Sequence, residues 1–301
     1  MPLPLDLSPA AFDALHDEPA AWRDEVTALA RQLGSATMQP FTEGTALVSR
    51  LDGGRILKVY PPFLADHFTF ERALLARLHG RLALPTPQAL ADGQWQGWPY
   101  LVMTELAGTL VTEVWPGLDE PRRLALLHDL GRLAAQVHAL PVGETAALAP
   151  SWPDFIARQR ERCVHRQQRT RLPAHLLAQV PAFVAGPLPE GPDVLLTGEY
   201  TPFNLLAADG RLAGMFDFGD GLIGPREYDL LGPLCFLAAG HPARVAAFLD
   251  GYGIRVDADM RLRLMRLLLL HKYSALPLQV QHPGWEQAPD FEALAERIWP
   301  L

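Results

Sequence analysis

The sequence predicts an α+β protein in which a small, β-rich N-terminal part with one helix precedes a larger, mostly helical part. Two observations predict this fold class. Before residue 106, short apolar runs alternate with Gly-rich turns, and after it apolar residues recur at helical spacing. A chain of 301 residues is long enough for one large domain or for two lobes. We expect a helical extension at 1–35, a small β-rich lobe at 36–106 and a larger, mostly helical lobe at 107–301.

The N-terminal part contains signals for each of its elements. Residues 8–34 carry apolar side chains at helical spacing and stop at a glycine, which predicts one or two short helices. Residues 45–60 contain two strand-like runs around Asp-Gly-Gly, a hairpin signal. Residues 68–80 return to helical spacing and end at a glycine. Residues 85–106 are typical of two further strands.

The C-terminal part is mostly of helical pattern. Residues 121–141 and 151–169 are predicted helices, and helical patterns resume after Pro225. Two short apolar runs interrupt them, at 193–196 and at 205–218, and an Asp-Gly turn signal divides the second run. The sequence therefore predicts a few short strands among the helices of this part.

Composition excludes several classes of function. With 49% hydrophobic and 20% charged residues, the chain is typical of a globular protein. A formal net charge of -8 provides no overall attraction to nucleic acid or to anionic membranes, so we expect neither as a partner. Two cysteines cannot form a disulfide framework, and the sequence has neither a signal-like N-terminus nor a long apolar stretch. We expect a cytoplasmic protein, and the sequence indicates no oligomeric state.

Three polar residues follow one another in and after the stretch LLTGEYTPFNLL (195–206). Glu199 and Asn204 belong to a loop that glycine and proline keep out of regular structure, and Asp217 follows the next strand. The Asn204 amide oxygen and the Asp217 carboxylate, facing each other across a hairpin, are ligands suited to Mg²⁺ with a nucleotide triphosphate. Glu199 is then a candidate proton acceptor.

A lysine lies inside an apolar strand of the N-terminal part, in ILKVY. Burying the Lys58 ammonium without a partner would be costly, and Glu71, on the following helix, is the natural counter-ion. A lysine oriented by a helical glutamate, together with a loop acid, an asparagine and an aspartate, is the arrangement that protein kinases use for phosphoryl transfer.

The stretch TGEYTPFNLLAADGRLAGMFDFGDGLIGPREYDLLG (197–232) resembles the aminoglycoside phosphotransferase family. The family loop usually reads His-Gly-Asp, four variable residues and Asn, and Ile-Asp-Phe-Gly-Asp follows it. The resemblance also includes ILKVY, the helix with Glu71, WPYLVMTELAG (98–108) and LGRLAAQVHAL (130–140). Through WPYLVM and the C-terminal HKYSALPLQV and FEALAERIW, the chain is similar to hygromycin B phosphotransferases in particular.

The resemblance implies a bilobal protein-kinase-like fold, in which the N-lobe at 36–106 binds nucleotide and the C-lobe at 107–301 carries the catalytic loop and substrate-binding helices. It implies an enzyme that uses ATP, with GTP not excluded, and Mg²⁺. It implies transfer of the γ-phosphoryl group to a hydroxyl of a small-molecule acceptor, such as an aminoglycoside or a related metabolite. Asn204 and Asp217 would hold the metal, Glu199 would be the base, and Asp229 would brace the catalytic loop. The residues that would contact the nucleotide are Lys58 with Glu71 at the phosphates, Thr42, Gly44 and Thr45 in a loop over them, and Met103, Glu105 and Leu106 in a hinge at the adenine.

Two positions depart from the family pattern. Glu199 stands where the family has the catalytic Asp, and Thr197 stands where it has His. The extra methylene of Glu moves the accepting oxygen by about 1.5 Å, the length of one bond. Displacement on this scale slows reactions in pre-organised sites, although positioning and charge neutralisation remain. Three alternatives follow: a working kinase with a Glu base, a slow kinase, or a nucleotide-binding pseudokinase that acts through a partner.

Other polar residues have simpler interpretations. His138 and His271 lie among leucines on helical patterns, which favours satisfied core or interface histidines. Asp220 and Glu227 could line the acceptor site, but helix capping is favoured. The segment 158–171 has six arginines, which could bind nucleic acid or an anionic substrate; a solvated helix face is favoured.

Overall fold

The computed structural model describes residues 2–198 and 200–300, so Glu199 lies outside the described residues. The chain divides into two compact units, and each unit is built from stretches that are not contiguous in the sequence. Unit 1 consists of Met1–Arg81, Pro85–Ala107 and Met215–Asp220, and unit 2 of Leu82–Leu84, Gly108–Gly214 and Gly221–Leu301. Unit 1 holds a five-stranded sheet and unit 2 is mostly helical, which agrees with the predicted α+β class.

The sheet of unit 1 is antiparallel and has the strand order β1-β2-β3-β5-β4. The β2–β3 hairpin turns through Gly53 and Gly54, whose φ angles of 74° and 67° are accessible to glycine at little cost. In this register Lys58 lies opposite Val48 on one neighbouring strand and Leu101 on the other. The strands are β1 (Met38–Pro40), β2 (Leu47–Leu51), β3 (Arg55–Val59), β4 (Ala89–Trp95) and β5 (Trp98–Thr104).

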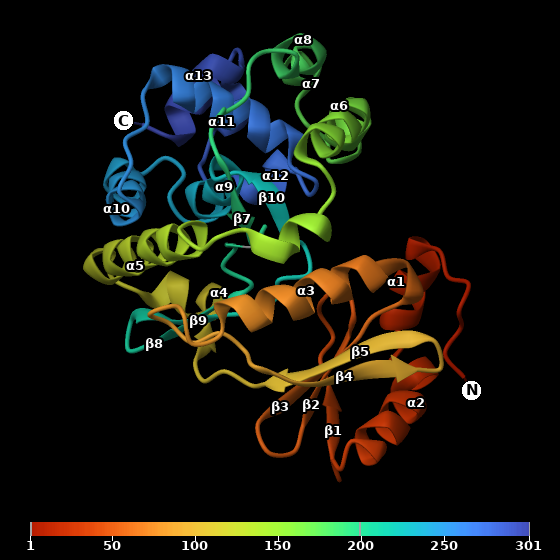
Figure 1. Cartoon of the computed structure of the whole chain (residues 1–301). Coiled ribbons are helices and arrows are strands. Elements are labelled where there is room, and N and C mark those ends of the chain that lie inside the picture. Colours follow the sequence, from red (N-terminus) through yellow and green to blue (C-terminus); the bar gives the residue numbers. More distant parts are fainter. Residues whose placement is uncertain (1, 199, 301) are drawn as a thin grey trace. The chain divides into compact units, whose positions relative to one another are not determined.

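Side chains of β3 alternate between the two faces of this sheet. Leu57 and Val59 join the apolar core that α1 (Pro9–His16) and α2 (Pro19–Gln32) complete with residues such as Phe12, Trp22 and Val26. Lys58 faces the other way, toward α3 (Ala65–Leu78), which follows the short helix η1 (Pro62–Leu64). Figure 1 shows α2 and α3 on opposite sides of the sheet. The alternation of side chains along β3 therefore places Lys58 against α3, while Leu57 and Val59 pack in the core.

Unit 2 contains two small sheets. β7 (Asp193–Leu196) pairs with β10 (Leu222–Pro225), and β6 (Thr109–Leu110), β8 (Leu205–Ala208) and β9 (Arg211–Met215) form the other sheet. Both strand regions expected at 193–196 and 205–218 are confirmed. The helices of this unit are α4 (Val111–Val114), η2 (Trp115–Gly117), α5 (Glu120–His138), η3 (Gly143–Ala147), α6 (Trp152–Arg169), α7 (Ala174–Leu177), α8 (Val180–Val184), α9 (Glu227–Phe236), α10 (Pro242–Tyr252), α11 (Ala258–Leu270), α12 (Leu276–Gln279), η4 (Trp285–Gln287) and α13 (Phe291–Ile298).

Helices α5 and α10 pack closely because each has a glycine at their contact. A Cβ atom on Gly131 would lie 2.2 Å from the backbone oxygen of Phe248, and one on Gly251 would lie 2.2 Å from that of His128. Such distances are far below van der Waals contact, so a side chain at either position would force the helices apart. These two glycines therefore set the spacing of the helix pair.

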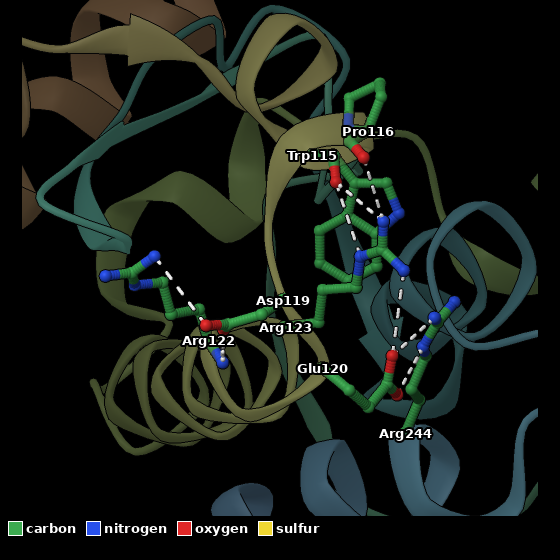
Figure 2. A network of polar contacts seen from close by, with 7 residues as sticks. All are labelled: Trp115, Pro116, Asp119, Glu120, Arg122, Arg123 and Arg244. Carbon is green, nitrogen blue, oxygen red and sulfur yellow. Dashed lines mark hydrogen bonds and ion pairs between the residues drawn. The ribbon is translucent and has the colours of Figure 1, made fainter.

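A network of arginines joins the start of α5 to the start of α10 (Figure 2). Arg244 donates two hydrogen bonds to the Glu120 carboxylate, at 2.8 and 2.7 Å. Arg123 donates to the backbone oxygens of Trp115 and Pro116 and lies 3.7 Å from a Glu120 oxygen. Both guanidinium carbons lie 5.5 Å from the centre of a Trp115 ring. The Arg244 hydrogen bonds lower the pKa of Glu120, which keeps its carboxylate charged.

Both cysteines are buried and free, as the sequence indicates. Burial raises the pKa of the Cys163 thiol to about 11, so at neutral pH it is protonated. Among residues 2–198 and 200–300, no helix combines the length and the apolar character that crossing a membrane requires.

We expect Gly131→Ala to lower the free energy of unfolding by about 1–3 kcal/mol, because the methyl group overpacks the α5–α10 contact. Chemical denaturation of the two proteins measures the change. Gly191→Ala is the control, since a Cβ there meets nothing within 4 Å. Equal losses for both variants would contradict the role of Gly131 in helix spacing.

We expect Glu120→Gln to lower the free energy of unfolding at neutral pH by about 1 kcal/mol, as for an exposed ion pair. The pKa of Glu120 is lower in the folded state, so its contribution is present above the unfolded pKa of about 4.3 and is lost as pH falls through the folded pKa. Denaturation curves between pH 7 and pH 3 should therefore converge for wild type and variant at the acid end. A difference that is independent of pH would contradict this account.

Candidate active site

The Lys58 ammonium of unit 1 is buried in an ion pair. Its Nζ lies 2.7 Å from Oε2 of Glu71 and 3.0 Å from Oδ1 of Asp217. The Lys58 side chain is 9% exposed, and that of Glu71 is fully buried. Burial by itself would lower the pKa of Lys58, but the carboxylates of Asp217 and Glu71 outweigh it and raise that pKa well above its usual value. Lys58 is therefore held in its charged form.

Glu71 accepts two more hydrogen bonds besides the one from Lys58. The Tyr60 hydroxyl donates to Oε2 at 2.5 Å, and the Phe218 backbone N–H donates to Oε1 at 3.2 Å. Burial, followed by the Glu71 carboxylate, raises the pKa of Tyr60 well above its usual range, so the phenol keeps its proton and can donate it. The buried carboxylate is thus satisfied on both oxygens.

Asp217 has an unusual backbone conformation. Its φ angle is +65°, in the left-handed region that residues with a Cβ adopt at a cost of about 1–2 kcal/mol. Its side chain is 32% exposed, in contrast to that of Glu71, so the carboxylate keeps an accessible oxygen. Such strain at a carboxylate beside a buried lysine is typical of functional sites.

The other residues predicted to contact nucleotide also lie in unit 1. Thr42, Gly44 and Thr45 are exposed in the loop between β1 and β2, where Gly44 has a φ angle of +118°. Met103 is buried within β5, and Glu105 and Leu106 follow that strand. The Glu105 side chain is occupied by Arg50 at 2.7 Å, and its backbone N–H donates to Gly54 at 2.8 Å.

In unit 2, the Asp229 carboxylate holds the start of the loop that the sequence predicts to be catalytic. Asp229 accepts backbone hydrogen bonds from Thr197 and Gly198, each at 2.8 Å, and one from the Thr197 hydroxyl at 3.2 Å. A fourth contact comes from Nε2 of His138 at 3.1 Å. The side chain of Asp229 is fully buried. The two residues before Glu199 are therefore fixed by a carboxylate of α9.

Residues after Glu199 are held by packing. Tyr200 is buried, and a Cβ atom on Gly232 of α9 would lie 2.7 Å from its backbone oxygen. A cavity of about 20 Å³, the room of one water molecule, is lined by residues that include Gly198, Thr201 and Asp229. Asn204 is partly exposed, and its N–H donates to the Thr201 oxygen at 3.1 Å.

His138 is a satisfied core histidine, as expected, and it is also part of this support. With Nε2 donating to Asp229, Nδ1 accepts from the Tyr252 hydroxyl at 2.8 Å. Burial raises the pKa of Tyr252 to about 12, so the phenol remains a donor. Sequence reasoning identified neither Tyr252 nor Tyr60. For Tyr60 a signal existed, since it lies two residues after Lys58 and therefore on the same strand face.

The helix-capping interpretation of Asp220 is wrong. β10, not a helix, follows Asp220, whose Oδ1 instead lies 3.3 Å from Nδ1 of His67. For Glu227 the interpretation is also wrong: Glu227 is the first residue of α9, that helix start has no side-chain cap, and Glu227 pairs with Arg226 at 3.2 Å.

In the arginine-rich segment, most arginines of α6 are exposed, as a solvated face requires.

The donor chemistry of the candidate metal ligands fits Mg²⁺. Asp217 offers a partly exposed carboxylate and Asn204 an amide oxygen, the hard ligands that Mg²⁺ prefers. In the part of the chain that the structure describes, no group of three or more His, Cys, Asp or Glu residues could hold a metal ion. A closed cage made by the protein alone is therefore not formed there, whereas Mg²⁺ usually combines one or two protein ligands with substrate phosphates.

Residues 37–265 match the model of the phosphotransferase enzyme family, which is more than half of the chain. The chain belongs to this family. The resemblance to aminoglycoside phosphotransferases is confirmed, and membership makes the chain a small-molecule phosphotransferase. The segment matched includes the strand with Lys58, the helix with Glu71, and the loops with Asn204 and Asp217.

Solved structures of phosphotransferases share the fold, which confirms the predicted bilobal protein-kinase-like architecture. The GDP complex of aminoglycoside 2′-phosphotransferase-IIIa has a TM-score of 0.68 and 17% identity, with 93% of this chain and 98% of that chain covered. The streptomycin–ATP–APH(2″)-IIa complex has a TM-score of 0.63 and 17% identity, covering 81% and 89%. Macrolide 2′-phosphotransferase MphH from Brachybacterium faecium has a TM-score of 0.62 and 20% identity, covering 92% and 99%.

We expect Asp229→Asn in this phosphotransferase to lower the free energy of unfolding by about 1–3 kcal/mol. The side-chain NH₂ of asparagine cannot accept a hydrogen bond, so one of the N–H donors of Thr197 and Gly198 would lose its acceptor. The start of the catalytic loop should loosen with it, so turnover should fall by more than nucleotide affinity. Thermal unfolding and nucleotide titration measure the two effects. Asp250→Asn, on the exposed face of α10, is the control and should change neither. Unchanged stability in Asp229→Asn would count against the described bracing.

Proposed function

We propose that this phosphotransferase moves the γ-phosphoryl group of ATP, with Mg²⁺, to a hydroxyl of a small-molecule acceptor. The observation that supports the proposal most is the buried Lys58–Glu71 pair with Asp217 at 3.0 Å from Nζ. Phosphoryl transfer depends mainly on positioning and on neutralising charge, and a fixed cation beside an accessible carboxylate provides both.

Residues of unit 1, together with Asn204 of unit 2, bind the nucleotide and its metal in this proposal. Lys58 contacts the α- and β-phosphates, and Glu71 orients it. The exposed loop of Thr42, Gly44 and Thr45 covers the phosphates, and the backbone at Met103, Glu105 and Leu106 meets the adenine. Asp217 and Asn204 hold Mg²⁺, which when bound neutralises phosphate charge during transfer.

In this proposal Glu199 accepts the proton of the acceptor hydroxyl. As the acceptor oxygen forms its bond to the γ-phosphorus, the bond between that phosphorus and the departing ADP oxygen breaks. The hydroxyl proton passes to the Glu199 carboxylate. Asp229 contributes by fixing the backbone of the two residues that precede Glu199.

The ligands of solved relatives support the proposed classes of acceptor and donor. The solved relatives include complexes with ATP, GDP, streptomycin and gentamicin, as well as a macrolide phosphotransferase. We infer an aminoglycoside-type antibiotic, such as hygromycin B, or a related hydroxylated metabolite as acceptor. ATP is the inferred donor, with GTP as the alternative. Two free buried thiols, together with the proposed use of a nucleotide triphosphate, support a cytoplasmic location.

The test is mass spectrometry of acceptors incubated with the protein, Mg²⁺ and either ATP or GTP. The acceptors are hygromycin B, kanamycin, streptomycin, gentamicin, a macrolide and a panel of metabolite alcohols. We expect a Mg²⁺-dependent gain of one phosphoryl group on at least one acceptor. Asp217→Asn should reduce the rate by about a hundredfold or more, as for loss of a group that positions transition-state charge. Asp66→Asn, an exposed acid of unit 1, is the control.

Glu199→Asp separates the alternatives that the glutamate raises. A large gain in turnover with unchanged ATP affinity would identify a kinase slowed by its base. Comparable turnover in both forms would support Glu199 as a competent base. Saturable ATP binding without transfer to any acceptor in either form would contradict the proposal and favour a pseudokinase.

A further inference from the structure

Helix α3 touches the segment Asp217–Asp220 through Glu71, which accepts the Phe218 backbone N–H, and also through His67. His67 lies one turn before Glu71 on α3, so both side chains are on the same helix face. Nδ1 of His67 lies 3.3 Å from Oδ1 of Asp220. The Asp220 side chain is 10% exposed and that of His67 is 29% exposed. The contact is therefore largely sheltered from water, where such pairs are stronger than at the surface.

The two contacts hold the segment from both sides of Gly219. Glu71 accepts the Phe218 backbone N–H through Oε1, before the glycine, and His67 meets Asp220 after it. A Cβ atom on Gly219 would lie 3.5 Å from Cβ of His67 and 3.6 Å from Oε2 of Glu71. The chain thus passes α3 at van der Waals distance, between two polar attachments.

Asp217 lies immediately before this pair of attachments, in its left-handed conformation with φ +65°. A residue with a Cβ keeps such a conformation where its surroundings impose it. Lys58 contacts only the carboxylate of Asp217 and therefore does not by itself fix the backbone torsions of the segment. Attachment of the following residues to α3 at Phe218 and Asp220 restricts those torsions directly.

We propose that His67 is a positioning residue, which through Asp220 holds the segment Asp217–Asp220 against α3 and so fixes the direction of the Asp217 carboxylate. The proposal rests on the proposed function insofar as Asp217 is taken as a ligand of the nucleotide-bound Mg²⁺. The attachment itself is independent of that function, because its members are all residues of unit 1.

The geometry gives a conservative replacement. Nδ1 of His67 makes the contact with Asp220, and the side-chain amide nitrogen of asparagine, a hydrogen-bond donor, occupies nearly the position of Nδ1. His67→Asn therefore keeps a donor at the required place, whereas His67→Ala removes it. His79, the exposed residue that follows the last residue of α3, gives the control His79→Ala.

The first experiment is hydrogen exchange of the peptide that contains Phe218–Asp220, in the protein without nucleotide. In His67→Ala we expect exchange about three- to tenfold faster than in wild type, the size of a lost side-chain coupling. His67→Asn should recover most of the protection, and His79→Ala should match wild type. Equal exchange in wild type and His67→Ala, with both proteins folded by thermal unfolding, would overturn the proposal.

The second experiment measures the Mg²⁺ concentration that gives half-maximal ATP binding by calorimetry. In His67→Ala this concentration should rise about three- to tenfold, while ATP affinity without Mg²⁺ changes by less than about twofold, within the usual scatter of independent sites. Faster exchange combined with an unchanged Mg²⁺ requirement would overturn the positioning role. If wild type binds no ATP at all, the proposed function fails, and the exchange comparison still decides whether His67 holds the segment.

Discussion

The buried pair of Lys58 and Glu71 is the interaction on which unit 1 depends. An ammonium and a carboxylate inside a protein are tolerated where they meet each other and where their remaining hydrogen-bonding capacity is used. Glu71 meets this condition with Tyr60 and with the Phe218 backbone, and Lys58 meets it with Asp217. The pair therefore requires α3, β3 and a segment from far along the chain to come together, and none of the three is free to move alone.

In unit 2, as in unit 1, a buried carboxylate fixes the backbone of an irregular segment. A fully buried carboxylate from a helix accepts backbone N–H groups of a loop that has no regular structure of its own. Glu71 does so for the segment with Asp217, and Asp229 does so for Thr197 and Gly198. A tyrosine reinforces each carboxylate, Tyr60 directly and Tyr252 through His138. Because a buried, paired carboxylate is costly to release, both loops are pre-organised before any ligand binds.

Much of this could be predicted from the sequence, for physical reasons. A lysine within an apolar strand requires a counter-ion, so Lys58 and Glu71 could be paired from the cost of burial alone. Alternating and helical periodicity located the strands and helices. The contacts of His67 and Tyr252 left no such signal, because neutral or weakly basic side chains do not demand a partner and their spacing is set by tertiary packing. Asp220 was misjudged for the same reason: its partner is distant in sequence.

Unit 1 is assembled from stretches that are far apart in the chain, since Met215–Asp220 joins a body otherwise complete by Ala107. During synthesis on the ribosome, the sheet and α3 emerge long before this last piece. Until residue 220 has left the exit tunnel, Lys58 lacks Asp217 and Glu71 lacks the Phe218 N–H. The nascent N-terminal portion thus carries an incompletely satisfied pair of buried charges while more than a hundred further residues are translated. During that interval unit 1 is less stable than in the finished chain.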